Sequence, residues 1–412
     1  MKNSRDNNSK VSPNNFNDNG MKPCIVCHSG ARDRYQVALA LYEAGILGYL
    51  VTDDYFLRKE YRGLIPRKHV KISYKALICV ILTKLHIRKN MNFQKDNYIG
   101  RLAGKLARKH DMNLLSYNKY AYSAFKSTEA PPSLSKRYKM IFQYHPHFQL
   151  IKDVYKKEIA VNPKVKNQLL KEDEFHMSEA QENQQIQEVK MADCAIVAST
   201  FTKVSLEYVG FNKEQIIVVP YGVDIQKYSI KQYNRSTELR LIYVGQFRPR
   251  KGMSYLLEAV KELEDEGYKL SLTLIGRSFE MKEEILSYQI KNLRIMIGLS
   301  DEEKIKELKN ADVFTFPSLI EGFAFVLTEA MSVGLPVIST THTCARDLVV
   351  NGEEGFVIEP FSKELVKDAI KYFLNHPEQI EVMGRKAHEK AKGITWKNFR
   401  NSVVEAVVKF CE

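Results

Sequence analysis

The stretch from Glu321 to Thr340, EGFAFVLTEAMSVGLPVIST, decides the fold. Its centre is apolar enough for a buried helix, and Gly334 and Pro336 end that helix before the strand-like run VIST. The residues in front of it, ADVFTFPS, have the pattern of another buried strand. A helix between two strands is the unit of an α/β fold. Glu321 and Glu329 are the two acids in this otherwise apolar stretch, and they require a functional explanation.

Strand patterns alternate with helical patterns along the rest of the chain. The predicted strands are PCIVCHS, GYLVTDD, MIFQYH, CAIVAST and IIVVP in the first half, and LRLIYVGQF, KLSLTLIG, LRIMIG, DVFTFPS, LPVIST and GFVIEP in the second. Capping boxes at Ser178/Gln181 and Ser300/Glu303 mark two helix starts. This alternation predicts two Rossmann-like, doubly wound α/β domains that face a cleft. A length of 412 residues also fits two domains.

The composition predicts a globular protein without a membrane span. The longest apolar run, Ala76 to Leu82, is far shorter than the ~20 residues that a span needs. The polar first 20 residues lack the apolar core of a secretory signal and are expected to be a disordered tail. We therefore expect a cytoplasmic protein. Cys24 and Cys27 form a C-x-x-C, but residues three apart on a strand point to opposite faces, which favours a structural role over a redox or metal site.

The basic residues gather in one segment. Residues 56–110 contain 15 Lys or Arg and two acids, a surplus equal to the net charge of the whole chain, +13. Because apolar residues alternate with these bases, an anionic membrane surface is the favoured partner. A solvated face that maintains solubility is one alternative. Nucleic acid or another polyanion is a further one, although no nucleic-acid-binding motif accompanies the charge.

The two glutamates are placed to bind a nucleotide sugar. Glu321 follows the strand ADVFTFPS, and the helix is expected to begin near Phe325, so Glu329 lies in its early turns. The unpaired N–H groups of residues 322–325 at this helix start favour an anion. Carboxylates beside an anion are suited to accept hydrogen bonds from hydroxyl groups attached to it. A diphosphate on the turn, with sugar hydroxyls on one glutamate and ribose hydroxyls on the other, fits this arrangement.

A second loop supports the same site. VGQFRPRKG contains Arg248, Arg250 and Lys251 between Gly245 and Gly252 at the predicted end of a strand. Three bases within four residues can neutralise phosphate, and the glycines permit a close approach of the backbone. Taken alone, the loop is more typical of an ordinary surface loop. On the same sheet edge as the two glutamates, it is expected to hold the diphosphate.

Together these stretches resemble the retaining glycosyltransferases of the GT-B fold, the family-four or group 1 type. The resemblance also includes LTLIG, IGLSDEEKIKELKNADVFTFPS, VVNGEEGFVIEP, ADCAIVASTFTKVSLEYVGFNKEQIIVVPYGVD and the TWKNF of the last helix. It covers the chain well from about residue 192 onward and the first half in outline.

The resemblance implies roles for individual residues. Glu321 is expected to contact the donor sugar, Lys251 and Arg248 to neutralise the diphosphate, and His145 in QYHPHF, preferred to His147, to lie near the sugar. The implied donor-binding residues are Glu329, Phe323, Ala324, Phe325, Val326, Gly245, Gln246, Ile297, Gly298 and Gly30. The family pattern implies no metal and no cofactor. Gln246 stands where the family usually has Arg, and the loop HSGARDRYQ has one glycine where a glycine-rich loop is common.

The resemblance also implies the organisation of the chain. We expect a tail at 1–20, an acceptor-binding domain at 21–226, a nucleotide-sugar-binding domain at 227–394 and, at 395–412, a helix that crosses back to the first domain. Residues 227–238 serve as the linker. The implied activity is retaining transfer of a sugar from a nucleoside diphosphate sugar to a hydroxyl acceptor in surface polysaccharide or glycolipid assembly.

The expected partners are the donor, a glycan or lipid-linked acceptor and the inner face of the membrane, which residues 56–110 would contact; no nucleic acid is expected. Two alternatives remain open at this point. One is a nucleotide-sugar epimerase or phosphorylase on the same fold, and the other is a non-catalytic protein that binds a polyanion or a membrane surface.

Overall fold

The computed structural model describes residues 21–31, 33–87, 91–129, 136–234 and 236–412, so the predicted tail lies outside the described residues. Contacts divide these residues into two compact units. Unit 1 comprises the described residues up to Phe142 together with Asn183–Ile196 and Arg400–Glu412. Unit 2 comprises Gln143–Glu182 and Val197–Phe399. The domain boundaries expected from the sequence stay a prediction.

A seven-stranded sheet has the order β3-β2-β1-β4-β5-β6-β7. Its strands are β1 Cys24–Cys27, β2 Leu47–Thr52, β3 Val70–Ile72, β4 Asn113–Tyr117, β5 Lys139–Gln143, β6 Cys194–Val197 and β7 Ile216–Val218. The helices of this half are α1 Gln36–Glu43, α2 Tyr74–Lys84, α3 Asn92–His110, α4 Ala121–Thr128, α5 Phe148–Val161, α6 Lys166–Leu169, α7 Glu179–Met191 and α8 Thr200–Tyr208. The pairs from β3 through β5 are all parallel, as expected of a doubly wound sheet.

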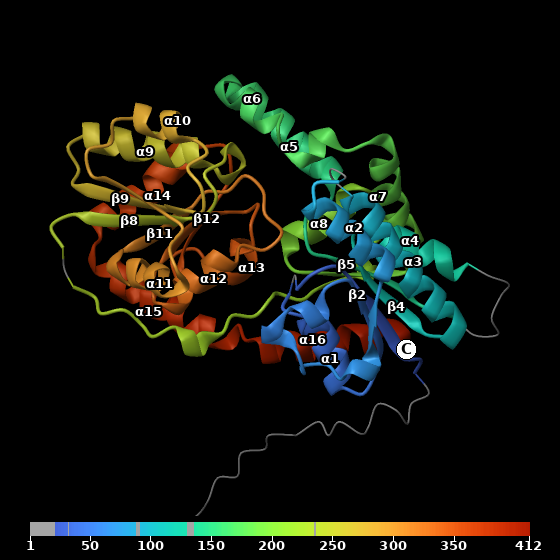
Figure 1. The fold of residues 1–412 in the computed structure, drawn as a ribbon. Helices are drawn as coiled ribbons and strands as arrows, with labels where there is room; N and C mark the ends of the chain where they lie inside the picture. The colour runs from blue at the N-terminus through green and yellow to red at the C-terminus, as the bar shows by residue number, and fades with distance from the viewer. Residues whose placement is uncertain (1–20, 32, 88–90, 130–135, 235) are drawn as a thin grey trace, which may run out of the picture. The chain divides into compact units, whose positions relative to one another are not determined.

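A six-stranded sheet in unit 2 has the order β10-β9-β8-β11-β12-β13, and all its pairs are parallel. Its strands are β8 Leu239–Val244, β9 Leu270–Gly276, β10 Leu293–Ile297, β11 Val313–Phe316, β12 Val337–Thr340 and β13 Gly355–Ile358. Its helices are α9 Met253–Asp265, α10 Lys282–Ser287, α11 Asp301–Asn310, α12 Phe325–Ser332, α13 Ala345–Leu348, α14 Lys363–Asn375 and α15 Glu378–Gly393. Helices α9 and α14 cover one face of the sheet, and α11, α12 and α15 cover the other (Figure 1). All six strands expected from the sequence are confirmed.

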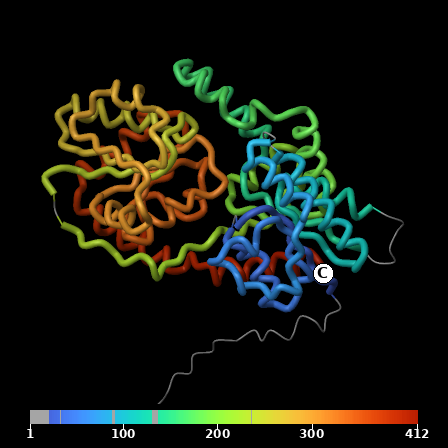
Figure 2. The backbone as a smooth tube through the Cα atoms, in the orientation of Figure 1, coloured from blue at the N-terminus to red at the C-terminus, as the bar shows by residue number. Residues whose placement is uncertain are grey.

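The last helix, α16 Trp396–Cys411, packs against elements from the beginning of the chain. From Arg400 onward it belongs to unit 1, where Nε of Arg400 lies 2.7 Å from Oε2 of Glu43. The amide of Asn113 also donates to Sγ of Cys411 over 3.4 Å. Figure 2 shows this red segment beside the blue start of the first sheet. The predicted crossover helix is therefore confirmed.

Two strands were not predicted from the sequence, β3 and β4. β3 has only three residues and lies in the basic segment, so it is too short to be distinguished as a strand there. β4 is completely buried between β1 and β5 but begins with a polar residue, Asn113. The Asn113 side chain bonds the backbone on two sides: its amide donates to the carbonyl of Lys22, and its carbonyl oxygen accepts from the N–H of Tyr138. These bonds permit its burial, which the sequence alone does not reveal.

The described residues of the predicted linker, 227–234 and 236–238, belong to unit 2. The side chain of Lys231 is almost completely buried, where it contacts the carbonyl of Ala311 and lies 3.4 Å from Oδ1 of Asp312. The hydroxyl of Tyr233 donates to the carbonyl of Gly334 over 2.8 Å. The segment is therefore held by specific contacts to residues that follow it in the chain.

A buried apolar cluster lies inside unit 2. It joins residues of α5 and the turns after it to Leu319 and Ile320, which follow β11; its members are Ile151, Val154, Tyr155, Val165, Leu169, Phe201, Leu319 and Ile320. The segment after β5 and the loop that carries Glu321 thus share one core. Among the described residues, no helix is both long and apolar enough to cross a membrane.

Candidate active site

Two loops meet at the carboxyl edge of the six-stranded sheet because they follow neighbouring strands, β8 and β11. The first contains Gly252, whose backbone has φ +69°, and a Cβ there would lie 1.9 Å from the carbonyl oxygen of Pro317 in the second loop. Only glycine permits this approach. The N–H of Leu319 also donates to the carbonyl of Arg250 over 2.9 Å. The predicted clamp and the predicted glutamate loop therefore form one structure.

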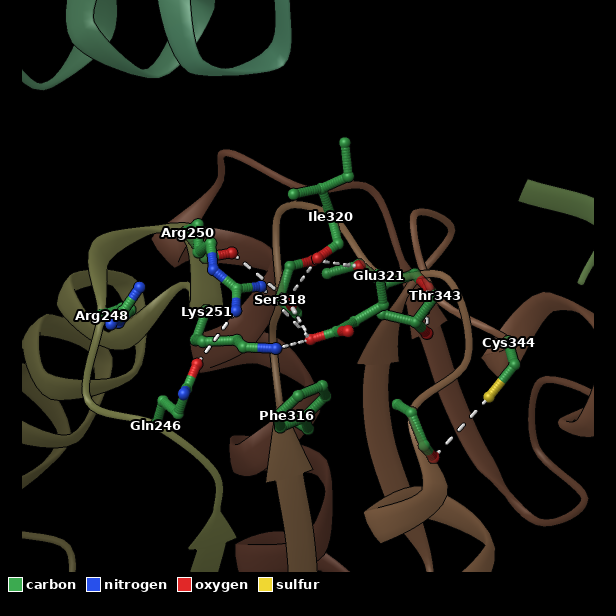
Figure 3. A network of polar contacts seen from close by, with 12 residues as sticks. Gln246, Arg248, Arg250, Lys251, Phe316, Ser318, Ile320, Glu321, Thr343 and Cys344 are labelled. Atoms are coloured by element: carbon green, nitrogen blue, oxygen red, sulfur yellow. Dashed lines mark hydrogen bonds and ion pairs between the residues drawn. The ribbon is translucent and has the colours of Figure 1, made fainter. Parts of the chain in front are cut away.

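At their junction, Lys251 contacts Glu321. Nζ of Lys251 donates to Oε1 of Glu321, and both residues are only 8% exposed (Figure 3). Oγ of Ser318 lies 3.5 Å from the same carboxylate oxygen, and Nη1 of Arg250 lies 4.0 Å from it. Burial, with Arg250 and Arg248 nearby, holds the pKa of Lys251 well below its ordinary value. The result is a buried pair of titratable groups, one of them with a perturbed pKa, where the sequence predicted a donor sugar and a diphosphate.

Arg248 is directed away from Glu321 (Figure 3). Its Nε lies 2.8 Å from Oε2 of Glu280, and its Nη1 lies 3.3 Å from Oε2 of Glu172. Arg250 is the arginine that reaches toward Glu321, and it also lies 3.5 Å from Glu172. The structure therefore brings Lys251 and Glu321 together, whereas Arg248 lies at the outer side of the clamp.

Gln246, which stands where the family usually has Arg, is part of the same network. Its Oε1 accepts a hydrogen bond from Nη2 of Arg250 over 3.0 Å. Its backbone carbonyl accepts one from the hydroxyl of Tyr243 over 2.8 Å. The neighbouring Gly245 donates to the carbonyl of Ile275. Gln246 thus orients Arg250, which supplies positive charge at this point of the loop.

The helix α12 begins at Phe325, as the sequence predicted. Within the described part of the chain, the backbone N–H groups of Phe323, Ala324, Phe325 and Val326 donate no hydrogen bond to the protein. The carbonyl of Gly322 is bound by Oγ of Ser199 over 2.6 Å, which fixes the loop from behind. Four free amides at a helix N-terminus, next to a buried lysine, are an arrangement that binds phosphate oxygens.

The QYHPHF motif lies against this loop within unit 2. A Cβ at Gly322 would come within 2.2 Å of the carbonyl oxygen of Tyr144 and 3.1 Å of the Cα of His145. The backbone of His145 is therefore in contact with the residue next to Glu321. His147 is buried at the start of α5, where Nδ1 accepts from the N–H of Gln149 and its own N–H donates to Ser205. His147 thus has a structural position, and His145 is the candidate near the site.

Glu329 lies in the second turn of α12 and pairs with a lysine from α11. Nζ of Lys304 lies 2.9 Å from Oε2 of Glu329, and the two side chains are 17% and 16% exposed. Of the predicted donor-binding residues, Ile297 is the last residue of β10 and is exposed, and Gly298 follows it. Gly298 has φ +72° and open space around its Cα.

Gly30 belongs to unit 1, at the end of β1. Its N–H donates to Oδ1 of Asp53 over 3.2 Å, and Oγ of Ser29 donates to Oδ2 of the same carboxylate over 2.7 Å. The following Arg34 and Tyr35 both have positive φ, which is uncommon for residues with side chains. This loop is thus a separate, tightly bonded polar turn of unit 1.

Three residues of the site were not singled out by sequence reasoning: Glu172, Ser318 and Lys304. Glu172 comes from a turn about 76 positions away from Arg248 in the chain, and no motif marks it. Ser318 and Lys304 lie inside stretches that were quoted, but nothing in their spacing distinguishes them from other polar residues. Among the described residues, no group of three or more His, Cys, Asp or Glu side chains is arranged to hold a metal ion.

Residues 224–390 match the family model described as "Glycosyl transferases group 1". These residues belong to the group 1 glycosyltransferase family. The matched segment contains the clamp loop, both glutamates and the free amides at the start of α12, so the group 1 glycosyltransferase domain holds most of the candidate site, whereas His145 and Glu172 precede it in the chain.

Curated relatives resemble the chain over part of their length. The putative colanic acid biosynthesis glycosyltransferase WcaL of Escherichia coli (strain K12) is 27% identical over 199 residues, which are 45% of this chain and 49% of WcaL. The capsular polysaccharide biosynthesis glycosyltransferase CapM of Staphylococcus aureus is 31% identical over 155 residues, 36% of this chain and 40% of CapM. The chain thus spans about half the length, or less, of these relatives.

Solved structures resemble the chain over nearly all of it. Sucrose-phosphate synthase from Thermosynechococcus elongatus has a TM-score of 0.66 at 16% identity and covers 94% of this chain and 98% of its own. The Anabaena protein Alr3699/HepE in complex with UDP and glucose has a TM-score of 0.60 at 15% identity and covers 94% and 100%. At such identities the likeness concerns the fold, and it confirms the GT-B fold beyond the group 1 glycosyltransferase domain.

Proposed function

We propose that this protein is a glycosyltransferase that moves a sugar from a nucleoside diphosphate sugar to a hydroxyl group of an acceptor, with retention of the anomeric configuration. The observation that carries the proposal is the buried Lys251–Glu321 pair beside the free amides of α12. A cation, a carboxylate and a row of N–H donors are the three kinds of group that a sugar diphosphate requires. They come from loops after neighbouring strands, where α/β sheets bind ligands.

In the proposed reaction the diphosphate lies on the amides of Phe323 to Val326, near Lys251 and Arg250. The bond between the anomeric carbon and the diphosphate oxygen breaks, and its electron pair stays on the diphosphate. The cations stabilise the charge that develops there. The acceptor oxygen bonds to the same face of the anomeric carbon, and its proton passes to an oxygen of the leaving phosphate. Glu321 accepts hydrogen bonds from sugar hydroxyls, and His145 lies on the sugar side.

We further propose that the donor is bound without a metal ion or another cofactor. Lys251 and Arg250 supply positive charge at the place where a divalent cation would otherwise neutralise the diphosphate, so the protein's own side chains fit that role. Activity and donor binding should therefore persist in EDTA. Loss of donor binding on adding EDTA, and its return with Mg²⁺ or Mn²⁺, would contradict this part of the proposal.

The proposed acceptor is a glycan or lipid-linked glycan. WcaL and CapM are named for colanic acid and capsular polysaccharide biosynthesis, which favours a surface polysaccharide as the product. Their names also favour sugar transfer over the epimerase, phosphorylase and non-catalytic alternatives. An epimerase would convert the donor without an acceptor, and a phosphorylase would need inorganic phosphate, so both can be tested with the same substrates.

We also propose that α2 contacts an anionic membrane surface. Four apolar side chains of α2 and its C-cap recur at helical spacing and are all exposed: Tyr74, Ile78, Ile81 and Leu85. Lys75 and Lys84 on the same helix are exposed as well. Apolar insertion combined with basic side chains is the pattern of an interfacial helix. Sedimentation with vesicles that contain phosphatidylserine should recover the protein, and Ile78→Glu/Ile81→Glu should leave it in the supernatant.

The first experiment is a thermal-shift screen with UDP-, GDP-, ADP- and CMP-sugars in the presence of EDTA. A ligand at ~100 times its dissociation constant stabilises the native state by about 2.7 kcal/mol. We expect a shift with one of the bases, and we expect Lys251→Met to abolish it. Lys261→Met is the matched control, because the Lys261 side chain on α9 is 32% exposed and pairs with Asp265 one turn along the same helix. No shift with any of the four classes would refute the proposed function.

A further inference from the structure

The pairing of Glu329 with Lys304 has a consequence for donor selection. Glu329 belongs to α12 and Lys304 to α11, and both helices lie on the same face of the six-stranded sheet (Figure 1). α11 follows directly on the Ile297–Gly298 turn, and a complete capping box at Ser300 and Glu303 fixes its first turn. Lys304 therefore reaches Glu329 from a well-defined helix start, on the side of the site where the nucleoside is expected.

The charge of Lys304 is determined by its neighbours. Burial alone would lower the pKa of Lys304, but the carboxylates of Glu329 and Asp301 raise it above its ordinary value. Lys304 therefore stays protonated and presents an ammonium group to the Glu329 carboxylate. Asp301 is the second partner of Lys304, at 3.1 Å, and its side chain is 75% exposed. It is too exposed to compete strongly with the more buried Glu329.

The geometry leaves one carboxylate oxygen for a ligand. Nζ of Lys304 lies 2.9 Å from Oε2 of Glu329, which is the buried oxygen of the carboxylate, whereas among the described residues Oε1 has no hydrogen-bond or ion-pair partner. A carboxylate with one oxygen fixed by an ammonium group presents the other oxygen in a defined direction. Without Lys304, rotation about the terminal bonds of Glu329 would spread that oxygen over several positions.

We propose that Lys304 is a positioning residue that fixes Glu329 for the ribose hydroxyls of the donor and thereby selects ribonucleoside over dideoxynucleoside diphosphates. This inference rests on the proposed function, since it assumes a nucleoside diphosphate in the site. Lys304 itself does not touch the reacting atoms. Its role is to determine the orientation of the Glu329 carboxylate, which would meet the ribose hydroxyls that the dideoxy form lacks.

The test compares the dissociation constants of UDP, GDP, ADP and CDP with those of their 2′,3′-dideoxy forms by isothermal titration calorimetry. In the wild type, the ribose form of the preferred base should bind about tenfold or more tightly than its dideoxy form, because hydrogen bonds to a charged acceptor are lost. Lys304→Gln should reduce this ratio to about two or less. It should weaken binding of the ribose form and leave binding of the dideoxy form nearly unchanged.

Two further variants make the result specific. Lys306→Gln removes an exposed lysine two positions along the same helix and should keep the wild-type ratio. Glu329→Gln should lose the ratio as Lys304→Gln does, and the double variant should lose no more than either single one, because the two residues act as one unit. A Lys304→Gln protein that melts normally and keeps the full ratio would overturn the inference.

The outcomes also separate this inference from the proposed function. If neither the ribose nor the dideoxy form of any base binds the wild type, the proposed function fails. If a ribose form binds and discrimination is insensitive to Lys304, only the inference fails.

Discussion

Glu321 and Glu329 lie eight residues apart, and each carboxylate meets a lysine from another element, yet their surroundings differ. Glu321 is 8% exposed and lies within a network of Lys251, Arg250 and Ser318 that spans two loops. Glu329 projects from a regular helix, and the side chains of the Lys304–Glu329 pair are 17% and 16% exposed, against 10% and 11% for Lys251 and Glu321. The Glu321 carboxylate takes part in the contacts that join the two loops. The Glu329 carboxylate lies on α12, a helix whose packing does not depend on it.

This difference predicts how each pair responds to mutation. A buried charge that loses its partner destabilises the native state strongly, whereas a partly exposed one is stabilised by water. Substitutions at the Glu321 pair should therefore affect folding and ligand binding together. Substitutions at the Glu329 pair should affect ligand binding with little effect on folding.

The largest effect is expected for Lys251→Met. It leaves the Glu321 carboxylate buried without its closest cation and should lower the free energy of unfolding by about 3–5 kcal/mol. Urea unfolding followed by the fluorescence of Trp396, the only tryptophan in the sequence and part of unit 2, measures this change. Replacing both partners, Lys251→Met/Glu321→Leu, should recover most of the loss. An unchanged unfolding midpoint for Lys251→Met would mean that the two glutamates do not differ as described.

The second largest effect concerns pH and a buried carboxylate whose hydrogen-bond donors are neutral. Glu158 accepts from the hydroxyl of Tyr255 over 2.6 Å, and burial raises its pKa from 4.5 to about 7. Because the folded protein holds this proton more tightly than the unfolded chain, the contribution of Glu158 to stability is fully present below pH 4.5, and ~3 kcal/mol of it should be lost as pH rises from 4.5 through 7.

Glu158→Gln should remove that fall and make the protein more stable than wild type at pH 8. Urea unfolding at pH 5, 6, 7 and 8 gives the profile, and Glu302→Gln on the exposed side of α11 is the control. If the free energy of unfolding has the same pH dependence in Glu158→Gln as in the wild type, the buried Glu158 stays ionised without a cation beside it. The contrast with Glu321, which has Lys251 as its partner, would then lose its basis.

A smaller effect is expected for Gly322→Ala, which disturbs the support of Glu321 without changing a charge. The added Cβ would meet the backbone oxygen of Tyr144 at 2.2 Å, so the two loops must move apart at a cost of about 1–3 kcal/mol. Donor binding should weaken in parallel because Glu321 moves with its neighbour. Gly393→Ala has no atom within 4 Å of the new Cβ and should change neither the unfolding midpoint nor the donor affinity measurably.

The smallest change in stability is expected for Lys304→Gln. Since the Lys304–Glu329 pair is partly exposed and both helices are held by their own packing, the loss should be about 1 kcal/mol or less. The same urea titration measures it next to Lys251→Met. A loss as large as that of Lys251→Met would remove the distinction between the two pairs.

More of the secondary structure of unit 2 than of unit 1 could be predicted from the sequence. The six strands of the second sheet and the start of α12 at Phe325 are confirmed because β-branched runs bounded by Gly and Pro are unambiguous there. β4 was not predicted, since its burial depends on backbone partners for Asn113 that lie elsewhere in the chain. Local patterns reveal a strand when its own residues determine burial, and they fail when a distant contact does.

The same limit applies to the site. The spacing of Glu321 and Glu329 and the bases of the clamp pointed to the two loops. The contact of Lys251 with Glu321 joins residues 70 positions apart, and the contact of Arg248 with Glu172 joins residues 76 positions apart. Arg248 is held by Glu280 and Glu172 together, whereas Arg250 lies between Glu172 and Glu321. No local pattern in the sequence reveals these contacts.

The apolar cluster around Leu319 and Ile320 bears on how such proteins recombine in evolution. A gene fusion that replaces everything before residue 227 would remove α5 and Phe201, and with them most of the partners of Leu319 and Ile320. The transplanted half would also lose Ser199 and Tyr144, which hold Gly322 from behind. Functional chimeras with relatives should therefore arise when residues 143–182 and 197–226 travel with the second half, so that the inherited module is discontinuous in the gene.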